Sequence, residues 1–355
     1  MSYGAIRASV HALRRSGSGP GPAFQRSWGT NGLIATLPNR ALSATSRPHG
    51  AGSFASYATP LHLKARRIAR SRVPIIRTYS STVNASSHAA DGELICNVTE
   101  HSPGHNVATI TISNPKKLNI VNSPLLRQII ATCNLLAEDD NLRAVVLAGA
   151  PTAEGKPPSW IGGMDIREMT QMNSYETAKK FITLVHHACD AFRQIPVPVI
   201  AKVHGFSLGA GLEIMVSCDL RIATKVSTFG MPEVKIGLPS VVEAALMPSL
   251  IGLGRTRRLM YLAENIPAEL AERWGLIEEL VEDEQALDAT VTKWVDMIVA
   301  NGPMAMRSQK RLMLKWENVS PEQGVQAGVE ALAAAFADGG TEPREYMAKF
   351  LHRKR

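Results

Sequence analysis

Apolar and polar positions alternate in short blocks along residues 94–282, and these blocks predict a mixed α/β domain. Short apolar blocks bounded by turn residues predict strands, as on either side of the Ser-Pro-Gly-His-Asn turn at 102–106. Longer blocks predict helices, one of them capped by Ser123 with Pro124 in its first turn. The predicted strands are 94–99, 107–112, 143–149, 199–203 and 219–224, and the predicted helices are 123–137, 174–194 and 268–275.

The chain is predicted to be helical from about residue 283 onward. Proline or glycine separates the helical stretches, and several of them carry an apolar stripe. The predicted helices are 285–300, 303–316, 321–337 and 343–354.

The first ninety residues differ in composition from the rest. They contain 12 Lys and Arg but no Asp or Glu. Residues 91–355, the body of the chain, contain the remaining 27 Lys and Arg and all 31 Asp and Glu, which gives the body a net charge of −4. Arg, Ser, Ala and Gly dominate, and Ile6, Val10 and Leu13 share one helical face, which is typical of a mitochondrial transit peptide. Residues 1–80 are therefore predicted to be a largely disordered presequence, cut near Tyr79 on import into the matrix. The alternative is a basic arm for nucleic acid or lipid.

Other sequence features narrow the class of protein. The four cysteines are far apart and form no C-x-x-C pair, so they predict neither a disulfide framework nor a metal site. His186 and His187 are adjacent, so their side chains diverge on a helix and are expected at the surface. No apolar run is long enough to span a membrane, and the acidic body argues against nucleic acid as a partner.

Residues 200–238 contain the pattern that points to chemistry. A strand runs into the turn Gly-Phe-Ser-Leu-Gly-Ala-Gly at 205–211, and a helix-like apolar run follows. A helix start offers unpaired backbone N–H groups, and small residues let a ligand approach them, so an anionic oxygen would be stabilised there. Glu213 lies in the first turn of that helix, and Glu233 follows 20 residues later. Two carboxylates beside an anion-binding turn predict proton transfers around an oxyanion intermediate.

Taken singly, each feature also fits a purely structural role, since glycine-rich turns join strands to helices and a first-turn Glu complements the dipole. Together they resemble the signature of the enoyl-CoA hydratase/isomerase (crotonase) family. That signature is G-[FY]-x-x-G-[GA]-G-x-E, then a Cys-Asp-hydrophobic strand, then F-x-x-P-E. The resemblance runs from about Leu94 to the C-terminus.

The resemblance implies an α/β fold of the crotonase-like (ClpP/crotonase) type, a spiral of repeated ββα units over residues 91–282. Residues 283–355 are then a C-terminal helical oligomerisation region. Family members form trimers and often dimers of trimers, so we expect a homotrimer or hexamer.

The resemblance also assigns binding residues. The stretch 157–166 resembles the family's F-x-x-G-x-D-[IL] anchor, so the backbone N–H groups of Met164 and Ala210 are expected to form the oxyanion hole. Lys116 is expected near the nucleotide part of coenzyme A, and Asp165 is also expected to cap the next turn. The expected substrate-binding and coenzyme A-binding residues are Lys116, Gly162, Gly163, Asp165, Ile166, Gly209, Pro232, Lys349 and Phe350, the last two acting from a neighbouring chain.

The activity implied by this resemblance is enoyl-CoA hydration. Glu213 is expected to hold and activate water, and Glu233 to protonate C2, with no metal or separate cofactor because coenzyme A is part of the substrate. The alternatives are an enoyl-CoA delta isomerase, a hydratase for branched or secondary-metabolite acyl groups, and a non-catalytic coenzyme A-binding or RNA-binding scaffold. Isomerases of the family often keep only the second Glu, so the presence of Glu213 favours hydration.

The chief departure from the family pattern follows Glu233. Relatives usually continue G-x-x-P-G-x-G-G-T-Q, whereas this chain reads Gly-Leu-Pro-Ser-Val-Val-Glu-Ala-Ala from Gly237. We therefore expect Val241 and Val242 to narrow the pocket and to make the substrate preference unlike that of a general short-chain hydratase. Glu243 is either a third carboxylate facing the acyl group or a solvated helix residue.

Overall fold

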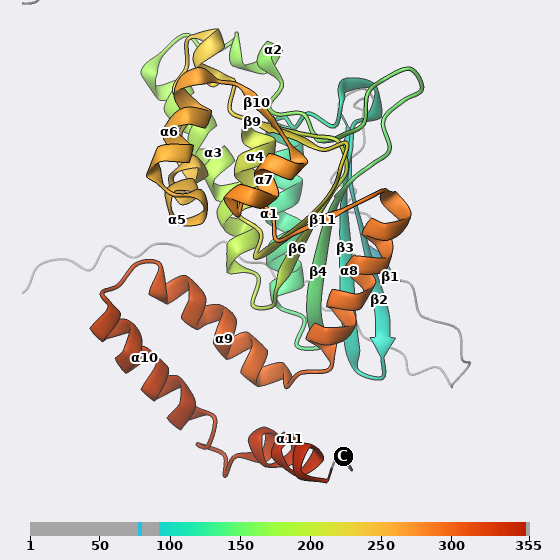
Figure 1. Ribbon diagram of the computed structural model, residues 1–355, viewed down its shortest axis with the longest axis vertical. Helices are drawn as coiled ribbons and strands as arrows, with labels where there is room; N and C mark the ends of the chain where they lie inside the picture. The colour runs from blue at the N-terminus through green and yellow to red at the C-terminus, as the bar shows by residue number, and fades with distance from the viewer. Residues whose placement is uncertain (1–76, 80–91, 353–355) are drawn as a thin grey trace, which may run out of the picture. The chain divides into compact units, whose positions relative to one another are not determined.

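The computed structural model describes residues 77–79 and 92–352 (Figure 1). The predicted presequence lies outside the described residues, apart from β1 (Arg77–Tyr79), which pairs with β2. Within the described part of the chain, no helix is long and apolar enough to cross a membrane.

A seven-stranded sheet runs in the order β1-β2-β3-β4-β6-β8-β11. β2 and β3 form an antiparallel hairpin, and every pair from β3 to β11 is parallel. β4 and β6 are covered on both faces, which explains why their sequences are continuous apolar runs. The strands are β2 (Glu93–Ser102), β3 (His105–Ser113), β4 (Leu142–Gly149), β6 (Val199–Val203), β8 (Leu220–Thr224) and β11 (Glu279–Val281).

A second sheet of four short strands runs in the order β10-β9-β7-β5. From β4 onward the chain places one strand in the large sheet, the next in the small sheet, and then forms a helix, so β4-β5-α3 is followed by β6-β7-α4. This alternation is the predicted spiral of ββα units. The strands are β5 (Ser159–Ile161), β7 (Phe206–Leu208), β9 (Thr228–Gly230) and β10 (Asn265–Pro267).

Helices between the strands fill one face of the large sheet and build the main core. The prediction that Ser123 caps the first helix is wrong by one residue, because the Asn122 side chain accepts the N–H of Leu125. The helices are α1 (Ser123–Ala137), α2 (Ile166–Met169), α3 (Tyr175–Gln194), α4 (Ala210–Val216), α5 (Met247–Ile251), α6 (Leu253–Leu262) and α7 (Ala268–Trp274). Three short 3-10 helices are η1 (Pro115–Lys117), η2 (Glu233–Ile236) and η3 (Val242–Leu246).

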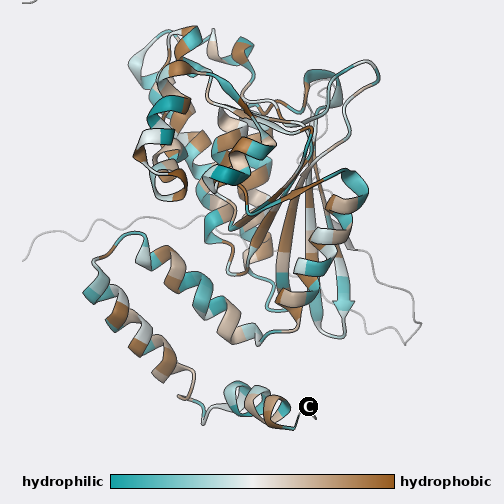
Figure 2. Ribbon diagram, in the orientation of Figure 1, coloured by the Kyte–Doolittle hydropathy of each residue, from teal (hydrophilic) through white to brown (hydrophobic). Residues whose placement is uncertain are grey.

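The C-terminal helices are α8 (Glu284–Val299), α9 (Pro303–Trp316), α10 (Pro321–Ala334) and α11 (Thr341–Leu351). α8 packs on the opposite face of the large sheet and forms a second apolar cluster with it. Two buried cations hold α9, since Arg307 donates to the Leu142 carbonyl and Lys310 pairs with Asp219. Figure 2 shows apolar residues along α9, α10 and α11. Many large apolar side chains between residues 303 and 351 are exposed. These are Met304, Met313, Trp316, Val325, Val329, Leu332, Phe336, Met347, Phe350 and Leu351.

Candidate active site

A cavity of about 510 Å³ lies among α2, α3, α4 and the segment that begins at Pro232. Both predicted catalytic carboxylates, Glu213 and Glu233, line it, although 20 residues separate them in sequence. The turns before α2 and α4 form the adjoining wall. The other predicted site residues found in this wall are Gly162, Gly163, Met164, Ile166, Gly209, Ala210 and Pro232.

Two residues of the cavity wall, Met164 and Ala210, have backbone N–H groups without an acceptor among the described residues. Met164 forms a parallel bridge with Val121, in which Val121 donates to the Gly163 carbonyl and Asp165 donates to the Val121 carbonyl. This pattern skips the N–H of Met164. Ala210 is the first residue of α4, and its N–H likewise has no acceptor among the described residues. The cavity therefore offers two unsatisfied N–H groups beside two carboxyls, which suits a developing oxyanion.

Glycine is required at the turn before α4 for steric reasons. Gly209 has φ 52°, and a Cβ there would lie 2.6 Å from Glu233 Oε1. A Cβ on Gly211 would lie 2.1 Å from the Ile161 carbonyl oxygen. The first glycine lets the turn approach the Glu233 carboxyl, and the second lets α4 pack against β5.

Glu213 is buried inside the site, with 4% of its surface exposed. Burial, followed by the charges of Glu233 and Glu243, raises the pKa of Glu213 to about 8 from an ordinary 4.5, and the backbone N–H groups of Ala244 and Val241 act against this rise. A carboxyl with this pKa holds a proton at neutral pH and exchanges it readily, as acid–base catalysis requires.

Glu233 begins η2 and is less buried than Glu213. Burial raises its pKa, and hydrogen bonds from its own backbone and from the Ser240 hydroxyl act in the opposite direction. Ser240 Oγ lies 2.9 Å from Glu233 Oε2. Sequence reasoning did not assign Ser240 a role, because serine after proline in a turn is common and only the fold brings it to the carboxylate.

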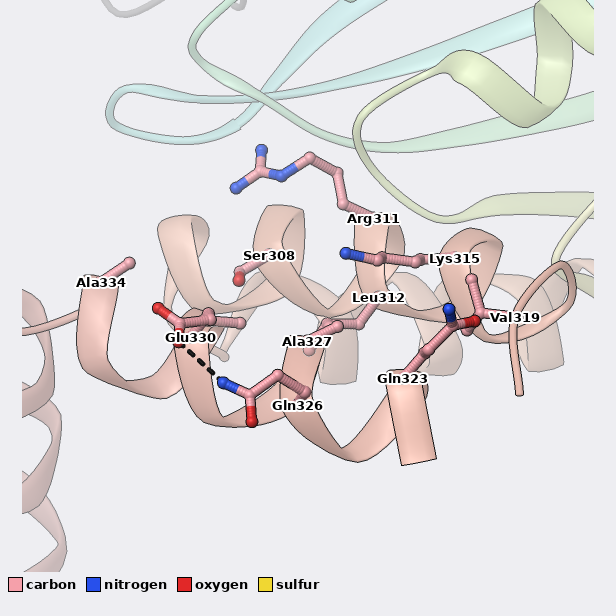
Figure 3. Close-up of a pocket in the computed structure, with 11 residues that line it drawn as sticks. Ser308, Arg311, Leu312, Lys315, Val319, Gln323, Gln326, Ala327, Glu330 and Ala334 are labelled. Carbon is pink, nitrogen blue, oxygen red and sulfur yellow. Dashed lines mark hydrogen bonds between the residues drawn. The ribbon is translucent and has the colours of Figure 1, made fainter. Parts of the chain in front are cut away.

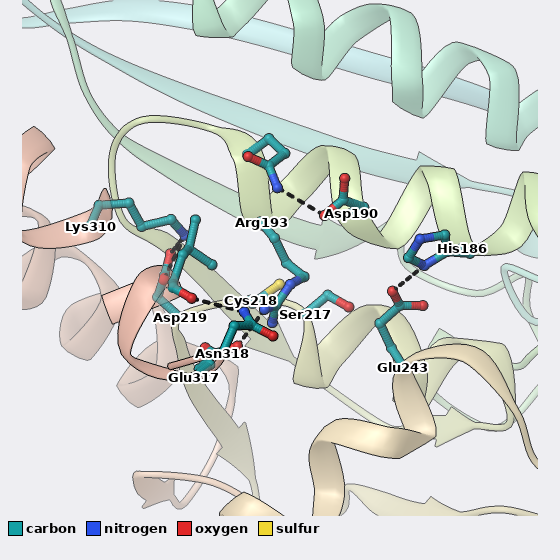
Figure 4. Close-up of polar contacts among 12 residues, drawn as sticks. His186, Asp190, Arg193, Ser217, Cys218, Asp219, Glu243, Lys310, Glu317 and Asn318 are labelled. Atoms are coloured by element: carbon teal, nitrogen blue, oxygen red, sulfur yellow. Dashed lines mark hydrogen bonds and ion pairs between the residues drawn. The ribbon is translucent and has the colours of Figure 1, made fainter. Parts of the chain in front are cut away.

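Glu243 neither faces the cavity nor reaches solvent, so both sequence interpretations of this residue are wrong. It is 5% exposed, and its Oε1 lies 2.7 Å from Nδ1 of His186 on α3 (Figure 4). His186 was expected to be a surface residue. Its side chain is 49% exposed, but one ring nitrogen is used by the buried carboxylate.

The departure after Glu233 places its two valines differently. Val241 lines the cavity as expected, whereas Val242 packs against the main core. Val242 also has φ 40°, a conformation that costs a β-branched residue about 1–2 kcal/mol. This left-handed residue stands between Val241, which lines the cavity, and the buried Glu243.

The acyl-sized space is mostly apolar. Among its lining residues Lys179 is the single cation, and the only carboxylates are Glu213 and Glu233. Sequence reasoning missed the contribution of α3, whose amphipathic pattern indicated a helix but not which of its faces meets the cavity. The apolar lining residues are Met164, Ile166, Met169, Met172, Phe181, Ile182, Val185, Leu208, Ile236, Leu238 and Val241.

Lys116 and Asp165 lie in a separate, smaller cavity of about 240 Å³. Asp165 caps α2, as predicted, by accepting the N–H of Arg167. The lining of this smaller cavity is rich in cations: Lys116, Lys117, Lys156 and Arg167. Such a surface suits phosphate groups better than an acyl chain.

Lys349 and Phe350 do not reach either cavity of their own chain. Lys349 pairs with Glu345 at 2.7 Å, and Phe350 is 76% exposed. Their assignment from a neighbouring chain stays a prediction.

A third hollow, of about 610 Å³, lies between α9 and α10 (Figure 3). Apolar side chains such as Leu312 and Val319 line it, and its polar groups include the Gln326–Glu330 hydrogen bond of 2.9 Å. Neither Glu213 nor Glu233 is among the residues that line it. Although it is the larger hollow, it lacks the groups that the chemistry needs.

Comparison with known proteins gives a consistent family. The sequence model described as Enoyl-CoA hydratase/isomerase matches residues 103–353. The chain is 32% identical over 250 residues to the short-chain-enoyl-CoA hydratase of Clostridium acetobutylicum, covering 70% of this chain and 92% of that protein. It is 29% identical over 250 residues to the crotonyl-CoA hydratase of Syntrophomonas wolfei, covering 70% and 93%.

Solved structures show the same fold. The structure of an enoyl-CoA hydratase from Mycobacterium smegmatis superposes with a TM-score of 0.66 at 26% identity, covering 73% of this chain and 97% of that one. The spiral expected from the sequence is thus confirmed.

Proposed function

The chain belongs to the enoyl-CoA hydratase/isomerase family, and from that premise we propose that it adds water across the 2,3 double bond of an enoyl-CoA thioester. The observation that carries this proposal is the cavity that Glu213, Glu233, Met164 and Ala210 line together, the last two with N–H groups that have no acceptor among the described residues. Relatives named as hydratases support it.

The oxyanion donors would act on the thioester oxygen. When water attacks C3, electrons move through C2 onto that oxygen, and the N–H groups of Met164 and Ala210 would stabilise the resulting enolate. Removing one such donor typically costs about 10²–10³ in kcat. Side-chain identity matters little for a backbone donor, so Met and Ala can both serve.

The two carboxyls would move the protons. Water gives one proton to an ionised carboxylate as its oxygen bonds to C3, and a protonated carboxyl gives one to C2. The resemblance assigns water to Glu213 and C2 to Glu233, and we keep that assignment for the substrate complex. The pair must therefore hold one proton between its two members.

This one-proton requirement gives the reaction a pH range. Since the pKa of Glu213 is about 8, the last shared proton leaves the pair near that pH, and kcat/KM should fall above it. On the acid side kcat/KM should fall as the pair takes up a second proton, since the pKa of Glu233 is also raised.

The acyl group is proposed to be neutral and apolar. The lining offers aliphatic, methionine and aromatic side chains with Lys179 as its single cation. A relative named methylglutaconyl-CoA hydratase from Mus musculus is 26% identical over 238 residues, but a carboxylated acyl group would need a buried cation that this lining lacks. Coenzyme A phosphates are proposed to bind near Lys116, and no metal or further cofactor is needed for the steps above.

Purified protein incubated with enoyl-CoA thioesters tests the proposal directly. Hydration consumes the conjugated 2-enoyl absorbance and gives a 3-hydroxyacyl-CoA detectable by mass spectrometry. A 3-enoyl-CoA substrate distinguishes the isomerase, because it would yield the 2-enoyl product. Absence of both reactions across straight, branched and aromatic acyl groups would leave the scaffold alternative.

We also propose that the protein works in the mitochondrial matrix as a homotrimer or hexamer. The acid-free basic N-terminus supports the location, as do relatives named as mitochondrial from Dictyostelium discoideum and Mus musculus. The exposed apolar side chains of α9 to α11 support subunit contacts. N-terminal sequencing of the protein from cells and light scattering of the purified protein test the two statements; an intact Met1 or a monomer would contradict them.

A further inference from the structure

A third buried carboxyl, Glu243, lies in a segment that packs on the helix of Glu213. Glu243 belongs to η3, which packs against both α4 and α3. Its sequence neighbours Val241 and Ala244 supply the backbone N–H groups that act on the Glu213 carboxyl. Glu243 thus lies within the turn that contacts Glu213, on the side away from the cavity.

One oxygen of the Glu243 carboxyl is hydrogen-bonded, and the other has no hydrogen bond to the described residues. Oε1 bonds to His186 Nδ1 at 2.7 Å, whereas Oε2 is buried and has no hydrogen-bond partner among the described residues. The residue is 5% exposed. A buried carboxylate oxygen without a hydrogen bond destabilises the fold, so a fold that needed η3 only for packing would gain from an apolar residue there.

The titratable groups around Glu243 come from two of the three helices that pack against η3. α3 contributes His186 and the buried thiol of Cys189, and α4 contributes Glu213, while α5 contributes no titratable side chain. Burial, followed by the charges of Glu243 and Glu213, raises the pKa of Cys189 well above its ordinary value. The His186 side chain, half-exposed, connects this buried group to solvent.

We propose that Glu243, held by His186, is a positioning residue that keeps the shared proton on the Glu213–Glu233 pair during turnover (Figure 4). The inference rests on the proposed acid–base pair. The charge of Glu243 makes loss of the last shared proton from the pair less favourable. Without that proton, Glu213, Glu233 and Glu243 would all be ionised in a buried region. The effect of Glu243 on the Glu213 pKa has this direction.

The main experiment compares the pH dependence of kcat/KM in the wild type and in Glu243→Gln. Gln keeps the size and the bond to His186 but removes the charge. The alkaline limb should move to lower pH by about one unit, since a neighbouring charge typically shifts a buried carboxyl by that order. Glu243→Asp, which keeps the charge, should restore the limb most of the way. Glu269→Gln, the same charge change at an exposed position on α7, should leave it in place.

A second readout does not depend on turnover. The infrared carbonyl band of a protonated buried carboxyl, assigned by its loss in Glu213→Gln, should titrate near pH 8 in the wild type and about one unit lower in Glu243→Gln. If Glu243→Gln does not fold, Glu243→Met removes the same charge at similar volume and should give the same shift.

The histidine is tested with its own neighbour as the control. His186→Gln releases Glu243 Oε1, so the carboxyl can turn away from Glu213 and the alkaline limb should again move down. His187→Gln changes the adjacent exposed residue of α3 and should not move it. A limb that stays in place in His186→Gln would overturn the anchoring role of His186.

The outcomes separate this inference from the proposed function. Hydration with an unmoved limb and an unmoved infrared band in folded Glu243→Gln would overturn the inference while the function stands. A shifted band in a protein without hydratase activity would keep the electrostatic link and overturn the function. A drop in kcat/KM by the same factor at every pH would show that Glu243 serves only the structure, and would also overturn the inference.

Discussion

The turn before α4 and the segment 237–246 face Glu213 from two sides, and they relate to the sequence pattern in opposite ways. Residues 205–213 match the family signature at nearly every position, and Gly209, Ala210 and Glu213 line the cavity. Segment 237–246 departs from it, and there the structure differs from what was expected of Val242 and Glu243. His186, which bonds to Glu243, is exposed as expected.

The difference comes from what each segment needs from its side chains. The turn acts through backbone N–H groups and close approach, so it demands small residues at fixed positions, and such demands are visible in a sequence. The 237–246 segment acts through side chains whose direction depends on one positive φ at Val242. No sequence pattern predicts a valine in that conformation.

The largest effect is expected from substitution of the two carboxyls themselves. Glu213→Gln and Glu233→Gln should each lower kcat by about 10²–10⁴, because Gln keeps the shape and hydrogen bonding but cannot exchange the proton. Binding of a 3-hydroxyacyl-CoA product, measured by calorimetry, should change little. Wild-type turnover in both variants would refute the role of the pair. Loss in Glu233→Gln alone, with 3-enoyl-CoA turnover retained in Glu213→Gln, would favour the isomerase.

The same Glu213→Gln change should stabilise the fold. At pH 7 the carboxyl is protonated in the folded protein, whose pKa is about 8, but ionised in the unfolded chain at an ordinary 4.5. Folding at pH 7 therefore carries a cost on the order of 3 kcal/mol that Gln avoids. The sign follows from the raised pKa: the cost grows as pH rises from 4.5 to 8 and vanishes below 4.5. Urea unfolding at pH 4 and pH 7 measures it, and equal stabilisation at both values would contradict burial as the cause.

Much of the architecture was predictable because its signals are local. The strand predicted at 199–203 has both of its predicted ends in the structure, and the strand predicted at 143–149 begins one residue earlier, at Leu142. Both were predictable because apolar runs bounded by turn residues are typical of buried parallel strands. The helix at 174–194 begins one residue later because Ser174 is its cap. The wall from α3 and the bond from Ser240 to Glu233 were not predictable, because both depend on segments that meet only after folding.

The role of segment 237–246 in substrate preference can be tested at Val241, which lines the cavity. Val241→Gly enlarges the acyl space, and a methylene in such a pocket is worth about 1–3 kcal/mol in discrimination. The ratio of kcat/KM for a bulky apolar enoyl-CoA over crotonyl-CoA should rise at least about tenfold. Val242→Gly is the matched control, because Val242 packs on the core and should leave the ratio near that of the wild type. An equal change in both variants would place the effect in the backbone rather than in the cavity.

The smallest effect tests the backbone conformation that separates the two valines. At an ordinary position alanine is more stable than glycine by about 0.5–1 kcal/mol, because glycine gains more freedom in the unfolded chain. Val242 has φ 40°, where a Cβ is penalised and glycine is not, so Val242→Gly should be more stable than Val242→Ala by about 1 kcal/mol. Val241 has φ −137°, and the same pair of variants there should show the ordinary order. Thermal and urea unfolding of the four variants measure both differences. If the alanine variant were more stable than the glycine variant at both positions, residue 242 would not adopt a left-handed conformation in the folded protein.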